Sequence, residues 1–153
     1  MSQQISEIRV SFQLKTCKCT RFEFTEFGKK NNKEIPTGTA QYTISVSFDV
    51  NEKEKTITVK LSTSVVDNPK SKNELFKIDS LHEFQFKEAT NVFIKNGDQV
   101  LVPNVLLISL YSVCLSNHRG MAAVKLENSI YENIIFPIID ASQFIPKPPA
   151  SFG

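Results

Sequence analysis

Cysteine and histidine are the residue types in this chain best suited to metal binding or nucleophilic catalysis, and few of them are present. The 153-residue sequence contains three cysteines and two histidines, His82 and His118. Cys17 and Cys19 lie two residues apart in a strand-like segment, so their side chains share one face. Structural zinc sites usually need a second matching pair of ligands. Cys-x-Cys alone is therefore a weak indication of zinc, and two small apolar residues in a sheet are the simpler interpretation.

Other motifs for catalysis are absent from the sequence. The five glycines are scattered and form no phosphate-binding loop, and neither Gly-x-Ser-x-Gly nor His-Glu-x-x-His occurs. Neither histidine lies at a recognisable spacing from a serine or cysteine nucleophile. The carboxylate pair Glu52 and Glu54 falls in a polar turn. We therefore expect a protein that is not an enzyme and that uses no cofactor or metal.

Charge and cysteine content narrow the function classes further. Eighteen basic and 16 acidic residues give a net charge of +2 without the basic block of a nucleic-acid-binding chain. The first residues lack the regions of a signal peptide. The apolar stretch 99–118 includes Pro103 and several serines, and it falls short of the roughly 20 apolar residues that span a bilayer. Three cysteines suit a reducing compartment. We expect a cytoplasmic protein without nucleic-acid binding or membrane insertion.

Alternation of apolar and polar residues predicts a four-stranded antiparallel sheet in the first part of the chain. A change of phase near 15–17 predicts a bulge in the first strand. The polar turn 51–55 joins the second and third strands as a hairpin. The eleven-residue connection Gly28–Gly38 is longer than a hairpin turn, so the second strand need not pair with the first. The strands are expected over 8–24, 42–50, 57–65 and 75–86.

One long helix is expected in the second half of the chain. No residue from Gln99 to His118 is charged, and nine of the eleven residues from Val105 to Leu115 are apolar or aromatic. Pro103 suits the first turn of this helix, and Arg119 followed by Gly120 suits its end. A helix that is apolar on nearly every side is buried from more than one direction. We expect another copy of the chain to supply the second layer. The expected oligomer contacts are Leu107, Leu110 and Tyr111.

These elements define the expected fold class as α+β, with the long helix packed on one face of the four-stranded antiparallel sheet. Residues 88–102 have mixed composition and predict a loop or a short helical turn. Three prolines between 146 and 149 end any regular structure near the C-terminus. We expect one domain over 1–145 and a flexible Pro-rich tail over 146–153.

The chain is unusually rich in phenylalanine, with twelve Phe residues and no tryptophan. Clusters lie near Phe22 to Phe27 and between Phe76 and Phe86. Any single Phe is more simply explained as a core residue. One long helix is nevertheless too little to cover both faces of the predicted sheet. Surplus aromatic residues near flexible connections can therefore form a groove for apolar segments of another chain.

The order of elements resembles the SecB family of export chaperones. That family has a four-stranded antiparallel sheet, a long connection after the first strand, and a long helix entered through a proline. An Arg-Gly step and a Pro-containing segment follow the helix. The run after the Arg-Gly step, Ala122-Ala123-Val124-Lys125, looks more like divergent SecB-like proteins than like classical members. The residues that carry the resemblance are Phe12-Gln13-Leu14, Phe22-Glu23, Leu75-Phe76-Lys77-Ile78, Phe84-Gln85-Phe86, Pro103, Ser116-Asn117-His118-Arg119-Gly120, and Phe136-Pro137-Ile138-Ile139-Asp140 with Phe144.

The resemblance implies a homotetramer, built as a dimer of dimers, that holds unfolded or nascent polypeptides in apolar grooves without ATP. It also implies a link to protein export through a translocase motor, whereas some divergent relatives serve toxin–antitoxin systems. The chain departs from classical members in being slightly basic rather than acidic and in having prolines in place of a final helix. The candidate client-binding residues are Phe22, Phe24, Phe27, Ile35, Phe76, Phe84, Phe86, Ile130, Tyr131 and Phe136.

Two other function classes stay open at this point. One is a small-molecule binder or enzyme with a helix laid across a curved sheet, as in hot-dog thioesterases. Such a site would need a catalytic carboxylate or a Gly-rich helix start facing a pocket. The other is an oligomeric scaffold without clients. Suppression of the aggregation of a denatured protein distinguishes a chaperone from both classes.

Overall fold

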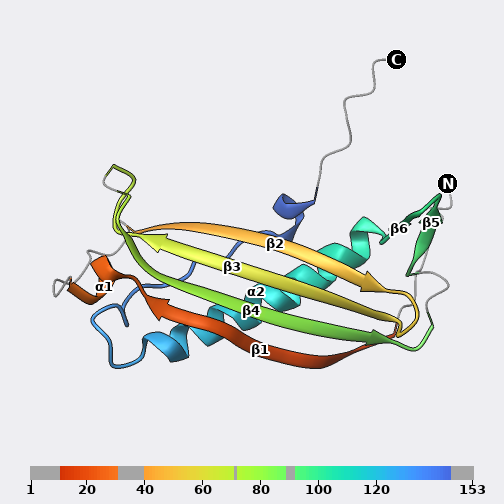
Figure 1. The fold of residues 1–153 in the computed structure, drawn as a ribbon, viewed down its shortest axis with the longest axis horizontal. Helices are drawn as coiled ribbons and strands as arrows, with labels where there is room; N and C mark the ends of the chain where they lie inside the picture. The colour runs from red at the N-terminus through yellow and green to blue at the C-terminus, as the bar shows by residue number, and fades with distance from the viewer. Residues whose placement is uncertain (1–10, 31–39, 71, 89–91, 146–153) are drawn as a thin grey trace, which may run out of the picture.

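The main sheet has four antiparallel strands, and the long helix α2 (Asn104–Leu126) crosses one of its faces (Figure 1). The computed structural model describes residues 11–30, 40–70, 72–88 and 92–145. This architecture confirms the expected α+β fold class, and the expected tail lies outside the described residues. The strands are β1 (Phe12–Phe24), β2 (Gln41–Asn51), β3 (Thr56–Val66) and β4 (Glu74–Phe86).

The strand order is β1-β4-β3-β2, so β1 and β2 are the two edges of the sheet. The turn at Glu52–Lys55 joins β2 to β3 as predicted, and β1 pairs with β4 rather than with β2. The register of β1 shifts between Leu14 and Thr16, which confirms the predicted bulge. It shifts again between Cys19 and Arg21, which the sequence pattern did not indicate.

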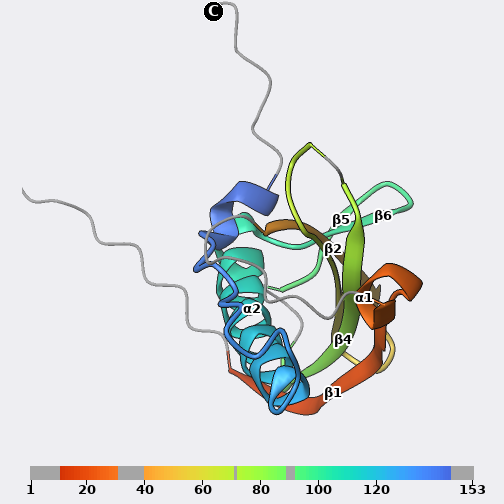
Figure 2. The same ribbon diagram turned by 90° about the vertical axis from the view of Figure 1, so that its left-hand side faces the viewer.

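The two faces of the sheet differ sharply in polarity because successive side chains point to opposite sides of a strand. On β3, Ile57, Val59 and Leu61 face α2 and are buried, whereas Lys60 and Ser62 lie on the other side and are exposed. Helix α2 lies on the opposite side of the sheet, and the short helix α1 (Glu26–Lys30) lies over this outer face at one end only (Figure 2). A sheet with one face on the core and one face in water is a common antiparallel arrangement.

Helix α2 is longer than predicted, because Gly120 lies within it and the helix ends at Leu126. Pro103 precedes its first residue as expected. Ala122 and Leu126 follow His118 at four-residue spacing, which places all three on one side of the helix, and all three are buried. The free energy gained by burying these side chains outweighs the tendency of Arg119 and Gly120 to end the helix. None of the helices in the described residues is long and apolar enough to cross a lipid bilayer.

The segment expected to be a loop or a helical turn instead contains a β-hairpin. Strands β5 (Ile94–Asn96) and β6 (Gln99–Leu101) pair with each other. Gly97 begins the turn between them with φ 65°, a conformation that glycine adopts without steric cost. Residues 89–91 are outside the described part of the chain.

The chain itself supplies part of the second layer that was expected from another copy. After α2, residues 127–145 run back along the helix and end in the short 3-10 helix η1 (Ala141–Phe144) (Figure 2). We call this stretch the return segment. Its Phe136 ring lies 5.1 Å from the Tyr42 ring and 6.3 Å from the Phe76 ring, and its Phe144 ring lies 6.5 Å from that of Tyr111.

The return segment also contacts the end of the sheet where β1 finishes. The short helix α1 (Glu26–Lys30) follows β1, and its Gly28 is buried against the backbone of Leu75. The Gly28 N–H donates to Thr25 Oγ1 (3.1 Å), and the Gly28 carbonyl accepts from the Tyr131 hydroxyl (2.9 Å). A larger residue than glycine does not fit at this position.

Substitution of the two helical glycines is expected to have opposite effects on stability. In Gly28→Ala, the new Cβ would lie 2.0 Å from the Leu75 carbonyl oxygen, so the backbone must shift. We expect a loss of about 1–3 kcal/mol in the free energy of unfolding, the usual cost of overpacking. The control, Gly120→Ala, meets no atom within 4 Å and should gain about 0.5–1 kcal/mol. Urea unfolding measures both changes, and equal effects would contradict the packing described here.

Candidate functional site

Five of the expected client-binding side chains lie in the core of the chain itself. Phe76, Phe84, Phe86 and Tyr131 are at most 1% exposed, and Phe136 is 5% exposed. Phe76, Phe84 and Phe86 occupy inward positions on β4, which is a central strand with neighbours on both sides. In this chain they therefore form the floor beneath α2 and not an open surface, which differs from the expectation.

The other expected client-binding residues lie closer to the surface. Phe22 and Phe24 are partly buried on the edge strand β1, where their rings lie 5.2 Å apart. Phe27 and Ile130 are exposed. Ile35 falls outside the described residues. The structure thus gathers a partly open apolar group at the α1 end of the sheet.

The expected oligomer contacts are buried against the chain's own sheet and return segment. Leu107, Leu110 and Tyr111 belong to the core, and the Tyr111 ring lies 6.4 Å from that of Phe48 on β2. The most apolar side of the helix packs against the sheet because this arrangement buries the largest apolar area. A different side of α2 is left open. Its exposed residues include Val105, Ser109, Ser112 and Ser116.

Two of these serines have hydroxyl groups that are already satisfied within the helix. Ser109 Oγ donates to the Val105 carbonyl (3.2 Å), and Ser112 Oγ donates to the Ile108 carbonyl (2.8 Å). A serine hydroxyl that donates to a carbonyl of its own helix needs fewer hydrogen bonds with water. This open side of α2 is therefore uncharged and only weakly polar.

A groove runs between α2, the edge strand β2 and the return segment. It has a volume of about 240 Å³, below the roughly 300–1,000 Å³ of most small-molecule sites. Its size suits one or two apolar side chains of a longer ligand. We call it the α2 groove. Its lining residues are Ile44, Ser112, Leu115, Ser116, His118, Arg119, Phe136, Pro137, Ile138 and Ile139.

The return segment presents apolar side chains to solvent beside this groove. Ile138 is 85% exposed and Ile135 is 71% exposed. The Tyr42 hydroxyl donates to the Ile135 carbonyl (2.8 Å), and Phe136 is buried next to it, so the exposed residues stand on an anchored backbone. The sequence-based candidates did not include Ile135 or Ile138. An extended segment without periodicity gave no signal of which side chains face outward.

A second open apolar pair lies at the start of β1. Phe12 is 39% exposed, and Leu14 is exposed to a similar degree. The Phe12 ring lies 5.7 Å from the Phe84 ring and 5.8 Å from the Phe86 ring, so it extends the buried aromatic floor to the edge of the sheet. Alternation along β1 places Phe12 and Leu14 on one face of the strand, but it does not show that α2 leaves them uncovered.

His118 joins α2 to the two central strands. Its Nε2 lies 2.7 Å from Thr63 Oγ1 on β3, and its Nδ1 lies 2.6 Å from Ser80 Oγ on β4. Burial lowers the pKa of His118 to about 4, with nearby His82 acting in the same direction, so the ring is neutral at pH 7. Ser80 and His118 are each 1% exposed. A substrate cannot reach this serine, and the contact serves to position the helix.

The other histidine and the cysteines form no recognisable reactive centre. Both ring nitrogens of His82 are buried without a hydrogen-bond partner in the described residues, and burial lowers its pKa. Burial raises the pKa of the Cys114 thiol to about 12, which makes it unreactive at neutral pH. Within the described ranges, no three His, Cys, Asp or Glu side chains are grouped so that they could hold a metal ion.

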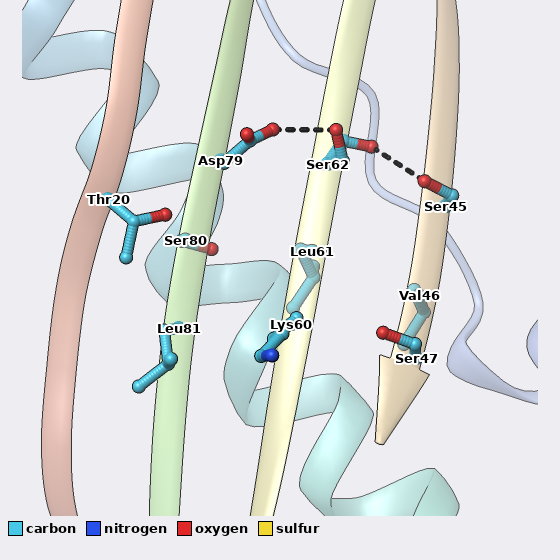
Figure 3. A pocket seen from close by; sticks show the side chains of 10 residues that line it. All are labelled: Thr20, Ser45, Val46, Ser47, Lys60, Leu61, Ser62, Asp79, Ser80 and Leu81. Carbon is cyan, nitrogen blue, oxygen red and sulfur yellow. Dashed lines mark hydrogen bonds between the residues drawn. The ribbon is translucent and has the colours of Figure 1, made fainter. Parts of the chain in front are cut away.

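The outer face of the sheet carries a shallow hollow of about 470 Å³ (Figure 3). There Ser62 Oγ donates to Asp79 Oδ1 (2.6 Å), and Ser45 Oγ donates to the Ser62 carbonyl (3.5 Å). Activation of a serine normally requires an adjacent base such as histidine, but His82 and His118 are buried on the other side of the sheet. The hollow therefore offers a polar, solvated surface without an activated nucleophile.

The fold described here is that of the SecB-like chaperones. One solved structure that shares it is the SecB-like chaperone Rv1957 of Mycobacterium tuberculosis, in complex with a ChAD peptide from the Rv1956 HigA1 antitoxin. The TM-score is 0.57 with 8% sequence identity, over 84% of this chain and 87% of that chain. No family model matches the sequence, and no curated protein matches it either. The similarity is therefore one of fold.

The His118 contacts predict that acid destabilises the folded chain. Between the ordinary pKa of 6.5 and the folded-state pKa of about 4, the unfolded chain binds a proton at His118 and the folded chain does not. The stability is therefore complete above the higher value and is lost as the pH falls through this window. The full difference corresponds to about 3 kcal/mol. His82, whose pKa is also lowered, acts in the same direction.

Comparison of wild type with His118→Gln separates the contribution of His118 to the pH dependence of stability from that of the carboxylates. The variant should be less stable than wild type near neutral pH, by about 1–3 kcal/mol, because the paired hydroxyl groups lose a well-placed partner. It should also lose less stability on acidification. Urea unfolding at several pH values measures both effects. Parallel profiles for the two proteins would show that His118 is not buried as a neutral ring.

Proposed function

We propose that this protein is a molecular chaperone that binds unfolded or nascent polypeptides at apolar surfaces and does so without ATP. The observation that carries the proposal is the exposed Ile138 beside the α2 groove, on a backbone anchored by Tyr42 and Phe136. Apolar side chains held open to solvent beside a groove are typical of binding surfaces. The shared fold supports the proposal, because the similar structure is a chaperone in complex with a peptide.

The physics of such binding favours weak and sequence-tolerant contacts. Complete burial of an Ile or Phe side chain contributes roughly 1.5–3 kcal/mol, and the loss of chain entropy in the client consumes much of that gain. One groove of about 240 Å³ accordingly holds a client only weakly. Folded proteins, which bury their apolar segments, are not bound. The proposed function is therefore binding and not catalysis.

The start of β1 provides a second surface for the same clients. Phe12 and Leu14 are exposed on the core side of the sheet, and the edge of β1 is free of any strand in the described residues. An extended polypeptide can add to such an edge through main-chain hydrogen bonds. Two separate surfaces on one chain also increase the apparent affinity for a long client through effective concentration.

Self-association extends the proposal to a cytoplasmic homotetramer built as a dimer of dimers. Its contact surface is the part of the open side of α2 that does not line the groove, around Val105 and Ser109, in place of the buried Leu107, Leu110 and Tyr111. Several copies of the α2 groove in one assembly would act together on one client. The mass in solution, measured by light scattering, tests this part directly.

A toxin–antitoxin partner is favoured over a translocase motor. The similar chaperone is in complex with a peptide from an antitoxin, and a peptide of this kind is the partner proposed here. The net charge of +2 differs from the acidic character through which classical family members meet a translocase. Neither a small-molecule site nor a thioesterase is favoured by a specific observation.

Replacement of the exposed isoleucine beside the groove should weaken client binding without affecting the fold. For Ile138→Ser we expect about tenfold lower affinity for a denatured model protein, equivalent to about 1.4 kcal/mol. Ile94→Ser is the matched control, because Ile94 is also exposed but lies on the β5–β6 hairpin. Aggregation of the denatured protein at stoichiometric ratio, followed by light scattering, measures the effect together with binding titrations.

The wild-type chain should suppress this aggregation, and the Ile94→Ser control should suppress it equally well. If wild type does not suppress aggregation, the proposed function is wrong. Copurification of a defined small ligand in that case would favour a small-molecule binder. Equal loss in both variants would place the client surface elsewhere.

A further inference from the structure

Arg119 differs from the other residues of the α2 groove in carrying a charge. It is partly buried on α2, and it is the one charged side chain among the described residues that line the groove, since His118 is neutral. The remainder of the lining is apolar or carries serine hydroxyl groups. A client that covers this groove must therefore also cover a guanidinium group.

This guanidinium has no carboxylate partner in the described part of the chain. The ion pairs found there involve Lys15, Arg21, Lys30, Lys60, Lys77 and Lys95, and none involves Arg119. The carboxylate nearest in sequence to the groove lining, that of Asp140, accepts a hydrogen bond from the Ser142 N–H (2.9 Å) and caps η1. Within the described residues, the positive charge of Arg119 is thus not neutralised by a carboxylate.

Binding of a purely apolar segment would leave Arg119 poorly solvated beneath it. A cation removed from water without a partner destabilises the complex, whereas a carboxylate restores the lost interactions through charge-assisted hydrogen bonds. Arginine is well suited to this because its planar guanidinium can donate two parallel hydrogen bonds to one carboxylate. A lysine in the client would have the opposite effect through like-charge repulsion.

We propose that the α2 groove selects client segments in which an aspartate or glutamate stands among apolar residues, with Arg119 as the group that recognises the side-chain carboxylate. The inference deepens the proposed function and rests on it. The occupant is a polypeptide segment that places one or two side chains in the groove, which has room for no more. The apolar lining supplies most of the affinity, and Arg119 supplies the preference among clients.

A series of short apolar peptides with amidated C-termini tests the proposal with the full chain. The peptides differ at one central position, which is Glu, Gln or Lys, and their affinities are measured by fluorescence anisotropy. Wild type should bind the Glu peptide about fivefold more tightly than the Gln peptide and the Lys peptide more weakly than either. The ratio between Glu and Gln should fall at high salt concentration, since salt screens the pair.

Variants then assign the preference to one side chain. Arg119→Gln should bind the Glu and Gln peptides equally, and Arg119→Lys should retain part of the preference. Lys125→Gln is the control, because Lys125 is an exposed cation in the last turn of α2 and does not line the groove. It should keep the full ratio. Urea unfolding establishes whether each variant is folded.

The outcomes separate the inference from the proposed function. If wild type binds all three peptides with equal affinity, the chaperone proposal stands and the role of Arg119 is wrong. If the preference for Glu persists in Arg119→Gln, another group recognises the carboxylate and the proposal is again overturned. If none of the peptides binds, the role of Arg119 is wrong, and the suppression of aggregation alone decides the chaperone proposal. Should Arg119→Gln not fold, the salt dependence in wild type and the Arg119→Lys ratio still decide the question.

Discussion

The position of α2 on the sheet determines which apolar side chains remain open beside the helix, and His118 fixes that position. The ring bridges Thr63 on β3 and Ser80 on β4, so one helical residue is tied to both central strands. Apolar packing alone is not directional and would tolerate a small rotation of the helix. The two hydrogen bonds require one rotation. That rotation places Leu110 in the core, Ser112 at the surface and Arg119 in the groove.

The sheet was predictable from sequence because its signals are local. Alternation along β2 and β3 with a polar turn between them defines a hairpin. The long connection after β1 indicated only that β1 and β2 need not pair, and β1 pairs with β4. The end of α2 was not predictable in the same way. Arg119 followed by Gly120 has the composition of a helix end, but Ala122 and Leu126 gain more by packing against the sheet. The β5–β6 hairpin is too short to show a clear period.

The candidate site was harder to predict because exposure depends on tertiary arrangement. Phe76, Phe84 and Phe86 have the composition of a binding surface, but β4 lies between two strands and beneath α2, which the strand pattern does not reveal. Conversely, Ile138 belongs to an irregular segment whose side chains have no periodic order. Its exposure follows from the burial of Phe136 two residues earlier and from the Tyr42 hydrogen bond at Ile135. Both contacts join residues far apart in the chain.

The polar outer face of the sheet has a consequence for the proposed binding of denatured clients. Serine, threonine, lysine and carboxylate side chains, such as Ser45, Lys60 and Asp79, remain hydrated on that face whatever occupies the α2 groove. A chain that carried a denatured client on one side would thus behave as an amphiphile, with its hydrophilic face turned to water. Such a face would keep the loaded particles dispersed, as the head groups of a detergent do around its tails.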